Sequence, residues 1–421
     1  MATMPQFFED KAPPPDSARI AERKKLFRAR IDLYLVLVVG ILLAIGLMMV
    51  FSTTFDWSYQ TYGDPSVIFM RQVRSMALGG VVTLLLALID YRIWKRFALW
   101  MMLVVIALLI ALLMTAPEVF GAQRAFINGS LQPGEVAQLV TIIYMAAWLS
   151  AKQSKIRRIS YGLIPFSILI GSVGGLIVLQ PDLSTASLIL ITAVTMFFLA
   201  GADLLQMGII GLFMGGIGYL FAMQISYAGS RLASYLASTT DLTKASYHVQ
   251  QAVIAFLNGG LTGVGLGESY QKFGFLPAPH TDSIFAVLAE ELGLLGCILV
   301  AGLFVVLAVR GYRIARGAPD SFGALLAAGV TTWIVVEALL NIAVMTAVLP
   351  FSGVPLPFIS FGGSALVTSM AGVGLLLSIS RVTARESVPE RRAHADPDLS
   401  RGDRGRSVPR VRRGRGAATG R

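Results

Sequence analysis

The chain has 421 residues, of which 55% are hydrophobic and only 14% charged. Soluble domains carry about 25% charged residues, so this composition, with a mean hydropathy of +0.70, excludes an ordinary soluble protein and indicates a membrane protein. The formal net charge of +11 would suit nucleic acid, but the positive residues follow a membrane pattern instead.

Apolar runs of about 17–25 residues are long enough to cross ~30 Å of hydrocarbon as helices. The sequence predicts ten such helices, at residues 33–53, 75–91, 97–116, 135–151, 161–180, 184–201, 206–224, 284–309, 322–349 and 365–381. We therefore expect an all-α, polytopic membrane protein with both termini on the same side and a large loop between the seventh and eighth helices.

The distribution of Lys and Arg orients these helices. With the N-terminus in the cytoplasm, 29 of the 35 Lys and Arg residues fall on the inner side and 6 on the outer side. An excess of positive charge in the inner segments is the pattern of bacterial membrane proteins. Both termini are therefore predicted to be cytoplasmic.

The two ends of the chain differ from the apolar middle. Residues 1–31 form a polar arm, longer than the charged start of a signal peptide, so the first apolar helix is interpreted as retained. Residues 382–421 form a basic tail rich in Gly, Pro and Arg, which favours contact with anionic lipid or a partner protein over RNA. Both ends are predicted to be disordered, around a membrane domain at 32–381.

The polar motifs gather in four outer segments: residues 121–139, 180–186, 225–283 and 349–366. Polar residues at one membrane interface indicate a site that works from that side. Three acids, Glu135, Asp182 and Asp282, stand at or near helix starts, where each could simply cap or favour a helix N-terminus. They would also surround one outward-facing vestibule, so the capping residues and the site residues can be the same.

Glu290 and Glu291 lie about 12–13 Å along the helix that follows Asp282, counted at 1.5 Å per residue. An ionised group at that depth costs several kcal/mol unless it faces protein, water or a cation. The two can belong to a site or to a buried network that locks helices together. Because neighbouring residues on a helix point ~100° apart, we expect different partners for them, with Glu337, Asn341 and Arg124 as possibilities.

Two further segments are rich in glycine or proline. Residues 258–269, "NGGLTGVGLGES", lack the GK[ST] ending and the preceding strand of a nucleotide loop, so close backbone approach or mobility is the better interpretation. The preceding residues 249–257 suit a short interfacial or re-entrant helix. Residues 350–363, "PFSGVPLPFISFGG", cannot form a regular helix and must be covered by protein or line a cavity.

Three blocks, "QPDLSTA", "YHVQQAVIAFLNGGLTGVGLGESYQKFGFLPAPHTDSIFAVLAEELGLLG" and "LPFSGVPLPFISFGGSAL", resemble the signature blocks of the FtsW/RodA/SpoVE family of shape, elongation, division and sporulation proteins. The resemblance covers about residues 32–381. It implies a ten-helix glycosyltransferase that polymerises lipid II outside the cytoplasmic membrane.

In this family the Asp of the His-Thr-Asp block is the essential catalytic residue, which corresponds to Asp282. The resemblance also implies supporting roles for Glu135 and Asp182. The chain departs from the family pattern at Gln138, where a lysine is usual, at Gln123-Arg124-Ala125, where Arg-Arg-Trp is usual, at Gly134, where Ser is usual, and at Ser283, often Phe.

The implied reaction joins the 4-hydroxyl of an acceptor sugar to the anomeric carbon of a donor and expels a polyprenyl pyrophosphate. Asp282 is expected to accept the hydroxyl proton as a general base, which contributes about 10²–10⁴-fold. The anionic leaving group needs cations, for which Arg124 and Arg231 are preferred. Further candidates for substrate binding or support are Lys272, Glu290, Glu291 and Ser360.

A divalent cation, Mg²⁺ or Mn²⁺, would suit oxygen ligands in a chain with few His and Cys. The expected partners are lipid II, membrane lipids, a class B penicillin-binding protein that acts as transpeptidase, and other division proteins, with no nucleic acid. The long basic tail favours a division protein at the septum of a bacterial inner membrane.

Three alternatives stay open. The elongation type of the same family, which acts in cell shape, is the runner-up. A lipid II flippase would need alternating access, usually with inverted repeats, and the sequence has no evident repeat. A non-catalytic division scaffold would tolerate the loss of Asp282.

Overall fold

The computed structural model describes residues 32–115, 132–152, 155–224, 226–238 and 241–395. In these ranges the chain is helical, with turns and loops and no strand, as the apolar periodicity predicted. The arm at 1–31 and the tail beyond 395 lie outside the described residues.

Ten helices coincide with the ten predicted spans. They are α2 (Leu33–Tyr62), α3 (Val67–Leu88), α4 (Arg92–Thr115), α5 (Pro133–Lys152), α6 (Leu163–Leu179), α7 (Leu183–Leu199), α8 (Leu204–Gln224), α11 (Ile284–Gly317), α12 (Ser321–Met345) and α13 (Gly363–Ala395). Among the described residues, seven are long and apolar enough to cross a membrane by length and composition alone. The other three, α6, α7 and α8, contain shorter apolar stretches.

Several helices are longer than the apolar runs that predicted them. α2 continues to Tyr62, and α11 reaches Gly317. α13 continues to Ala395, which is 14 residues past the predicted domain end at 381. The backbone hydrogen bonds of a helix are made within the segment and do not require apolar side chains. Hydropathy therefore marks the apolar part of a helix and not its ends.

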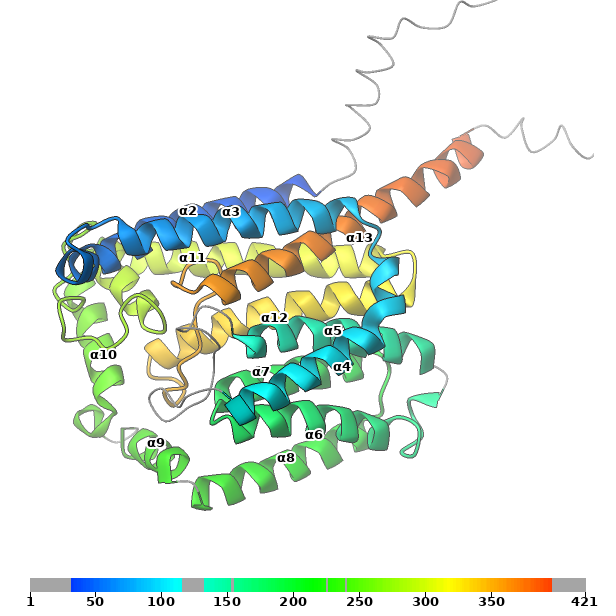
Figure 1. Cartoon of the computed structure of the whole chain (residues 1–421), viewed down its shortest axis with the longest axis horizontal. Helices are drawn as coiled ribbons and strands as arrows, with labels where there is room; N and C mark the ends of the chain where they lie inside the picture. The colour runs from blue at the N-terminus through cyan, green and yellow to red at the C-terminus, as the bar shows by residue number, and fades with distance from the viewer. Residues whose placement is uncertain (1–31, 116–131, 153–154, 225, 239–240, 396–421) are drawn as a thin grey trace, which may run out of the picture.

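The large loop between α8 and α11 contains its own helices. α9 (Ser226–Ser238) is followed by a short 3₁₀ turn at Leu242–Lys244 and by α10 (Tyr247–Gly259). α10 includes the predicted short interfacial helix. Figure 1 shows α9 and α10 at one end of the bundle, opposite the end at which α2 begins and α13 finishes.

The centre of the bundle is α12, which packs against α11, α5 and α7, while α13 packs along α3. At the end of the bundle where α2 begins, polar side chains fix the helix starts. Asp32 caps α2 through the Leu35 amide at 3.1 Å and accepts two bonds from Arg310 of α11, at 3.0 and 2.6 Å. Asp320 likewise caps α12 and pairs with Arg92 at 3.0 Å.

Candidate functional site

A cavity of about 150 Å³ lies between the outer ends of α5 and α7, α12, and the loops before α11 and α13. We call it the acid-lined cavity, because four carboxylates face it: Glu135, Asp182, Asp282 and Glu337. The structure therefore brings the three acids singled out in the sequence to one place. The other lining residues are Gln132, Gln138, Ser184, Thr185, Leu188, Thr281, Gly353, Val354, Pro355, Phe361, Gly362 and Ala365.

Two of the acids belong to helix starts. Asp182 is the N-cap of α7: its carboxylate accepts from the Thr185 amide at 3.4 Å and from the Thr185 hydroxyl at 2.8 Å. Glu135 lies in the first turn of α5 and is 8% exposed. Helix starts are common positions for acidic residues, and here the same two positions also place the acids at the cavity wall.

Asp282 stands just before α11, but the N-cap position is Ser283, so Asp282 does not cap this helix as the sequence allowed. Its main chain is held instead. The Asn341 side-chain amide donates to the Asp282 carbonyl at 2.8 Å and to the Val354 carbonyl at 2.6 Å. These bonds tie the segment before α11 to the proline-rich loop.

Ser360 supports the same segment from the proline-rich loop. Its hydroxyl donates to the Thr281 carbonyl at 2.7 Å and accepts from the Leu356 amide at 2.8 Å. The Phe361 amide donates to the His280 carbonyl at 2.8 Å. The loop that cannot be helical is thus covered by protein and fixes the backbone on both sides of Thr281.

Gly353 brings this loop against the Asp282 side chain. Its φ is +69°, and a Cβ built there would lie 3.1 Å from Asp282 Oδ2. Only glycine adopts this conformation without strain. The glycine therefore leaves room for the carboxylate at the cavity wall.

His280 contributes structure next to the site. Its ring stacks on Trp57 with 4.7 Å between centroids, and it is not among the residues that line the cavity. Burial lowers the pKa of His280 to about 4, so the imidazole is neutral at pH 7. The imidazole therefore packs beside the site rather than acting in it.

Arg231 lies outside the acid-lined cavity. From α9, its guanidinium donates to the Phe351 carbonyl at 2.9 Å and lies 5.1 Å from the centroid of that ring. Phe351 is two residues before Gly353, so Arg231 contacts the loop that shapes the cavity rather than its interior. Arg124 falls outside the described residues.

Glu290, Glu291 and Lys272 form a buried network away from the acid-lined cavity. Glu290 accepts from the Asn258 amide at 3.1 Å, and Glu291 pairs with Lys272 at 2.9 Å. The two acids do have different partners, but neither Glu337 nor Asn341, which the sequence offered as possibilities, is among them: Glu337 lines the acid-lined cavity and Asn341 bonds to the Asp282 and Val354 carbonyls. The remaining bonds of the network involve Ser52, Gly267, Ser269 and Gln271.

The glycine run is used for close backbone approach. α11 is broken at Gly293, whose φ is +68° and ψ −168°. The Val264 amide donates to the Glu290 carbonyl at 3.0 Å, and the Leu294 amide to the Gly260 carbonyl at 3.0 Å, so the run satisfies the bonds that the break leaves open. A Cβ on Gly263 would lie 2.1 Å from the Glu291 carbonyl oxygen, which explains the need for glycine.

The described residues contain no group of three His, Cys, Asp or Glu side chains placed to hold a metal ion. The four acids of the cavity thus do not form a ready-made metal site, and we assign no step of the chemistry to a metal.

The sequence did not identify two residues, Glu337 and Asn341, as part of the candidate site. They are four apart on α12, which puts both on one helix face, and this spacing was the available signal.

The sequence model of the cell cycle protein family FtsW/RodA/SpoVE matches residues 32–385. Stage V sporulation protein E of Bacillus subtilis is 37% identical over 83% of this chain and 97% of its own length. The probable peptidoglycan glycosyltransferase FtsW of Coxiella burnetii is 37% identical, over 86% of this chain and 99% of its own.

Solved structures share the fold. A chain from a peptidoglycan synthase complex that coordinates polymerisation and crosslinking has a TM-score of 0.68 and 26% identity, over 84% of this chain and 98% of that one. The rod shape-determining protein RodA of Thermus thermophilus has a TM-score of 0.62 and 25% identity, over 83% and 97%.

Proposed function

Because the chain belongs to the FtsW/RodA/SpoVE family, we propose that it is a peptidoglycan glycosyltransferase that polymerises lipid II on the outer face of the cytoplasmic membrane. The observation that carries the mechanism is the placement of Asp282, whose backbone is fixed by Asn341 and which lines a cavity of about 150 Å³. Proteins named as peptidoglycan glycosyltransferases are 35–37% identical to it over most of the chain.

In the proposed step, the 4-hydroxyl oxygen of the acceptor sugar attacks the anomeric carbon of the donor. The bond from that carbon to the pyrophosphate oxygen breaks, and undecaprenyl pyrophosphate leaves with the bonding electrons. The hydroxyl proton passes to Asp282, acting as a general base. The alcohol is too weak a nucleophile at neutral pH for the reaction to proceed at a useful rate without that base.

The polar lining of the cavity indicates which part of the substrate it accepts. Glu135, Asp182 and Glu337 offer carboxyl oxygens to it, and such oxygens are good hydrogen-bond acceptors for sugar hydroxyls. The cavity therefore suits the acceptor sugar, and we place the pyrophosphate outside it. Arg231, beside the loop at Phe351, is the proposed cation on that side; Arg124 keeps the role proposed from sequence.

A divalent cation is a separate proposal. It would accompany the pyrophosphate, since hard cations bind phosphate and carboxylate oxygens. Polymerisation measured with EDTA and then with added Mg²⁺ or Mn²⁺ tests this: activity that survives full chelation removes the cation from the proposal.

The function is tested by purified protein in detergent, given lipid II and its partner, with glycan strands separated on a gel. Asp282→Ala and Asp282→Asn should abolish the strands and leave expression and folding intact. Glu268→Gln removes an exposed outer acid and should have no effect. A flippase would make no strands in detergent, and a scaffold would retain its role in the Asp282 variants.

We propose a class B penicillin-binding protein as the crosslinking partner and the division septum as the location. The similarity to a synthase complex that joins polymerisation to crosslinking and to FtsW proteins supports this choice. A fluorescent fusion imaged in dividing cells distinguishes a septal band from the sidewall pattern of an elongation enzyme.

A further inference from the structure

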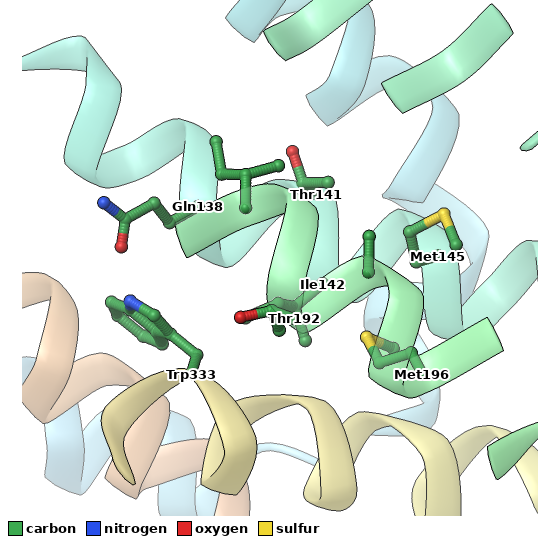
Figure 2. Close-up of a pocket in the computed structure, with 9 residues that line it drawn as sticks. Gln138, Thr141, Ile142, Met145, Thr192, Met196 and Trp333 are labelled. Atoms are coloured by element: carbon green, nitrogen blue, oxygen red, sulfur yellow. The ribbon is translucent and has the colours of Figure 1, made fainter. Parts of the chain in front are cut away.

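A second, smaller pocket lies next to the acid-lined cavity, deeper in the bundle. It is enclosed by α5, α7 and α12 and has a volume of about 10 Å³. Gln138 lines both spaces, so it forms the wall between them. Figure 2 shows Gln138, Thr141, Thr192 and Trp333 around this inner pocket, with Met145 and Met196 further along it.

Four polar atoms at the inner pocket make no hydrogen bond to protein: Gln138 Oε1, Thr141 Oγ1, Thr192 Oγ1 and Trp333 Nε1. All four residues are 3% exposed or less. Figure 2 shows the amide end of Gln138 directed toward the indole nitrogen of Trp333. Buried polar groups in native proteins are nearly always paired, so four in one pocket indicate a missing partner.

Two of these atoms, the hydroxyls of Thr141 and Thr192, also lack the bond that a helical threonine usually makes within its own helix. Helical threonines elsewhere in the chain satisfy their own hydroxyl by donating to the carbonyl four residues back, as Thr195 and Thr331 do at 2.8 and 2.7 Å. Thr141 and Thr192 do not. They lie about 12 and 13.5 Å along their helices from the first residue, at 1.5 Å per residue, and both residues line the pocket.

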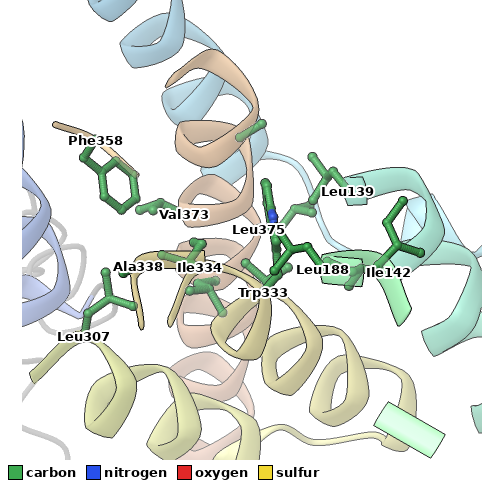
Figure 3. Close-up of a cluster of buried hydrophobic side chains, with 14 of the residues drawn as sticks. Leu139, Ile142, Leu188, Leu307, Trp333, Ile334, Ala338, Phe358, Val373 and Leu375 are labelled. Atoms are coloured by element: carbon green, nitrogen blue, oxygen red, sulfur yellow. The ribbon is translucent and has the colours of Figure 1, made fainter. Parts of the chain in front are cut away.

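Apolar side chains close the end of the inner pocket away from the acid-lined cavity. Figure 3 shows Trp333 within a cluster of buried apolar side chains that includes Leu139, Ile142 and Leu188. Gly329 lets Met196 and Ile142 close that end, since a Cβ there would lie 2.6 Å from Met196 Sδ. The indole N–H interacts with the Glu337 carboxyl without reaching hydrogen-bonding geometry.

We propose that the inner pocket binds one ordered water molecule, which bonds to at least two of the unpaired polar atoms that line it, Gln138 Oε1 among them, and fixes the Gln138 side chain at the wall of the acid-lined cavity. A pocket of about 10–15 Å³ holds one water, which needs two to four polar partners. The donor set fits water better than an alkali cation, because an indole N–H donates and repels positive charge. Gln138 is then a positioning residue, and the inference does not depend on the reaction that the cavity carries out.

X-ray radiolytic footprinting of the full-length protein in detergent tests this, because radicals formed from bound water oxidise side chains next to it. Met145, Met196 and Trp333 are at most 1% exposed, so bulk water does not reach them. We expect them to be oxidised several-fold faster than Met49, which is equally buried, in α2. Labelling no faster than Met49 shows a dry pocket and overturns the proposal.

Thr141→Val and Thr192→Val remove one hydroxyl each and nearly keep the shape. With water present, the variant at a threonine that bonds to it loses a hydrogen bond, which lowers the thermal midpoint by about 1 °C, and the labelling of Met196 falls. In a dry pocket each removes an unsatisfied group, so an unchanged or raised midpoint in both variants contradicts the water. Thr195→Val, whose hydroxyl bonds to Ile191, is the control for a lost helix bond.

The same thermal melt in sodium chloride and in choline chloride separates water from a cation. Bound water predicts equal midpoints in the two salts. A midpoint that rises with sodium and not with choline assigns the pocket to an alkali ion and overturns the water proposal.

Discussion

Asn341 donates one hydrogen bond to the carbonyl of Asp282, at 2.8 Å. Its second N–H donates to Val354 at 2.6 Å, so one side chain on α12 joins the segment before α11 to the loop before α13. The base of the proposed reaction is therefore held through its backbone, by a residue that does not line the acid-lined cavity. Precision of this kind matters, because a misplacement of about 1 Å can cost 10²-fold in rate.

Asn341→Asp should lower kcat by about 10–100-fold, because a carboxylate cannot donate to the two carbonyls and repels them. We expect KM for lipid II to change little, since Asn341 does not contact the substrate. Initial rates of strand formation over a range of lipid II concentrations give both constants. A variant with wild-type kcat would show that Asp282 is positioned without Asn341.

Gly353→Ala should reduce activity strongly and stability slightly. The left-handed conformation costs an alanine about 1–2 kcal/mol, and the new Cβ would lie 3.1 Å from Asp282 Oδ2, which displaces the carboxylate. Gly274→Ala is the matched control, because its φ is +88° and no atom lies within 4 Å of the new Cβ. If both variants lose equal activity, strain alone explains the loss and the contact with Asp282 is irrelevant.

Lys272→Met should destabilise the protein by about 3–5 kcal/mol, because it leaves the Glu291 carboxylate buried without its cation. The side chains of the pair are 6% and 0% exposed. Lys272→Met combined with Glu291→Leu should recover much of the loss, which thermal unfolding in detergent can measure. Lys244→Met is the control: its pair with Asp241 is exposed, and such pairs contribute about 0–1 kcal/mol.

Much of this fold follows from hydropathy alone. All ten apolar runs are helices, and the short helix predicted at 249–257 lies in α10. Among the helix starts the largest error is that of α3, which begins at Val67 rather than at 75, because Arg71, Gln72 and Arg74 lower the hydropathy there. Gln72 is nevertheless buried and accepts from the Gly362 amide at 3.3 Å, a tertiary contact that no local pattern contains.

The site was predictable to a similar depth. Glu135, Asp182 and Asp282 were found because each stands at an outer helix start. Glu337 was not assigned to the cavity, and Glu290 and Glu291 were placed in a list of supporting residues although they lock the glycine run onto α11. A buried acid that lines a cavity and a buried acid in a structural network have the same sequence pattern and the same position along a helix. Only their contacts with other helices distinguish the two cases.

His280 should make a contribution to the stability of the protein that is lost as the pH drops from 7 to 5. Its pKa is about 4 when folded, lowered by burial, and about 6.5 when unfolded. Between those values the unfolded chain binds more protons, so the free energy of unfolding decreases as the pH falls. The linkage amounts to about 1–2 kcal/mol at pH 5.

His280→Phe keeps a ring to stack on Trp57 and removes the titration. The midpoint of thermal unfolding should therefore fall less between pH 7 and pH 5 in this variant than in the wild type. Burial and the charge of Arg231 also lower the pKa of His248, so its contribution has the same sign. Because His248 is present in both proteins, this contribution cancels in the comparison. Equal pH dependence in the two proteins would mean that protonated His280 is accommodated beside Trp57, against the burial that the ring shows here.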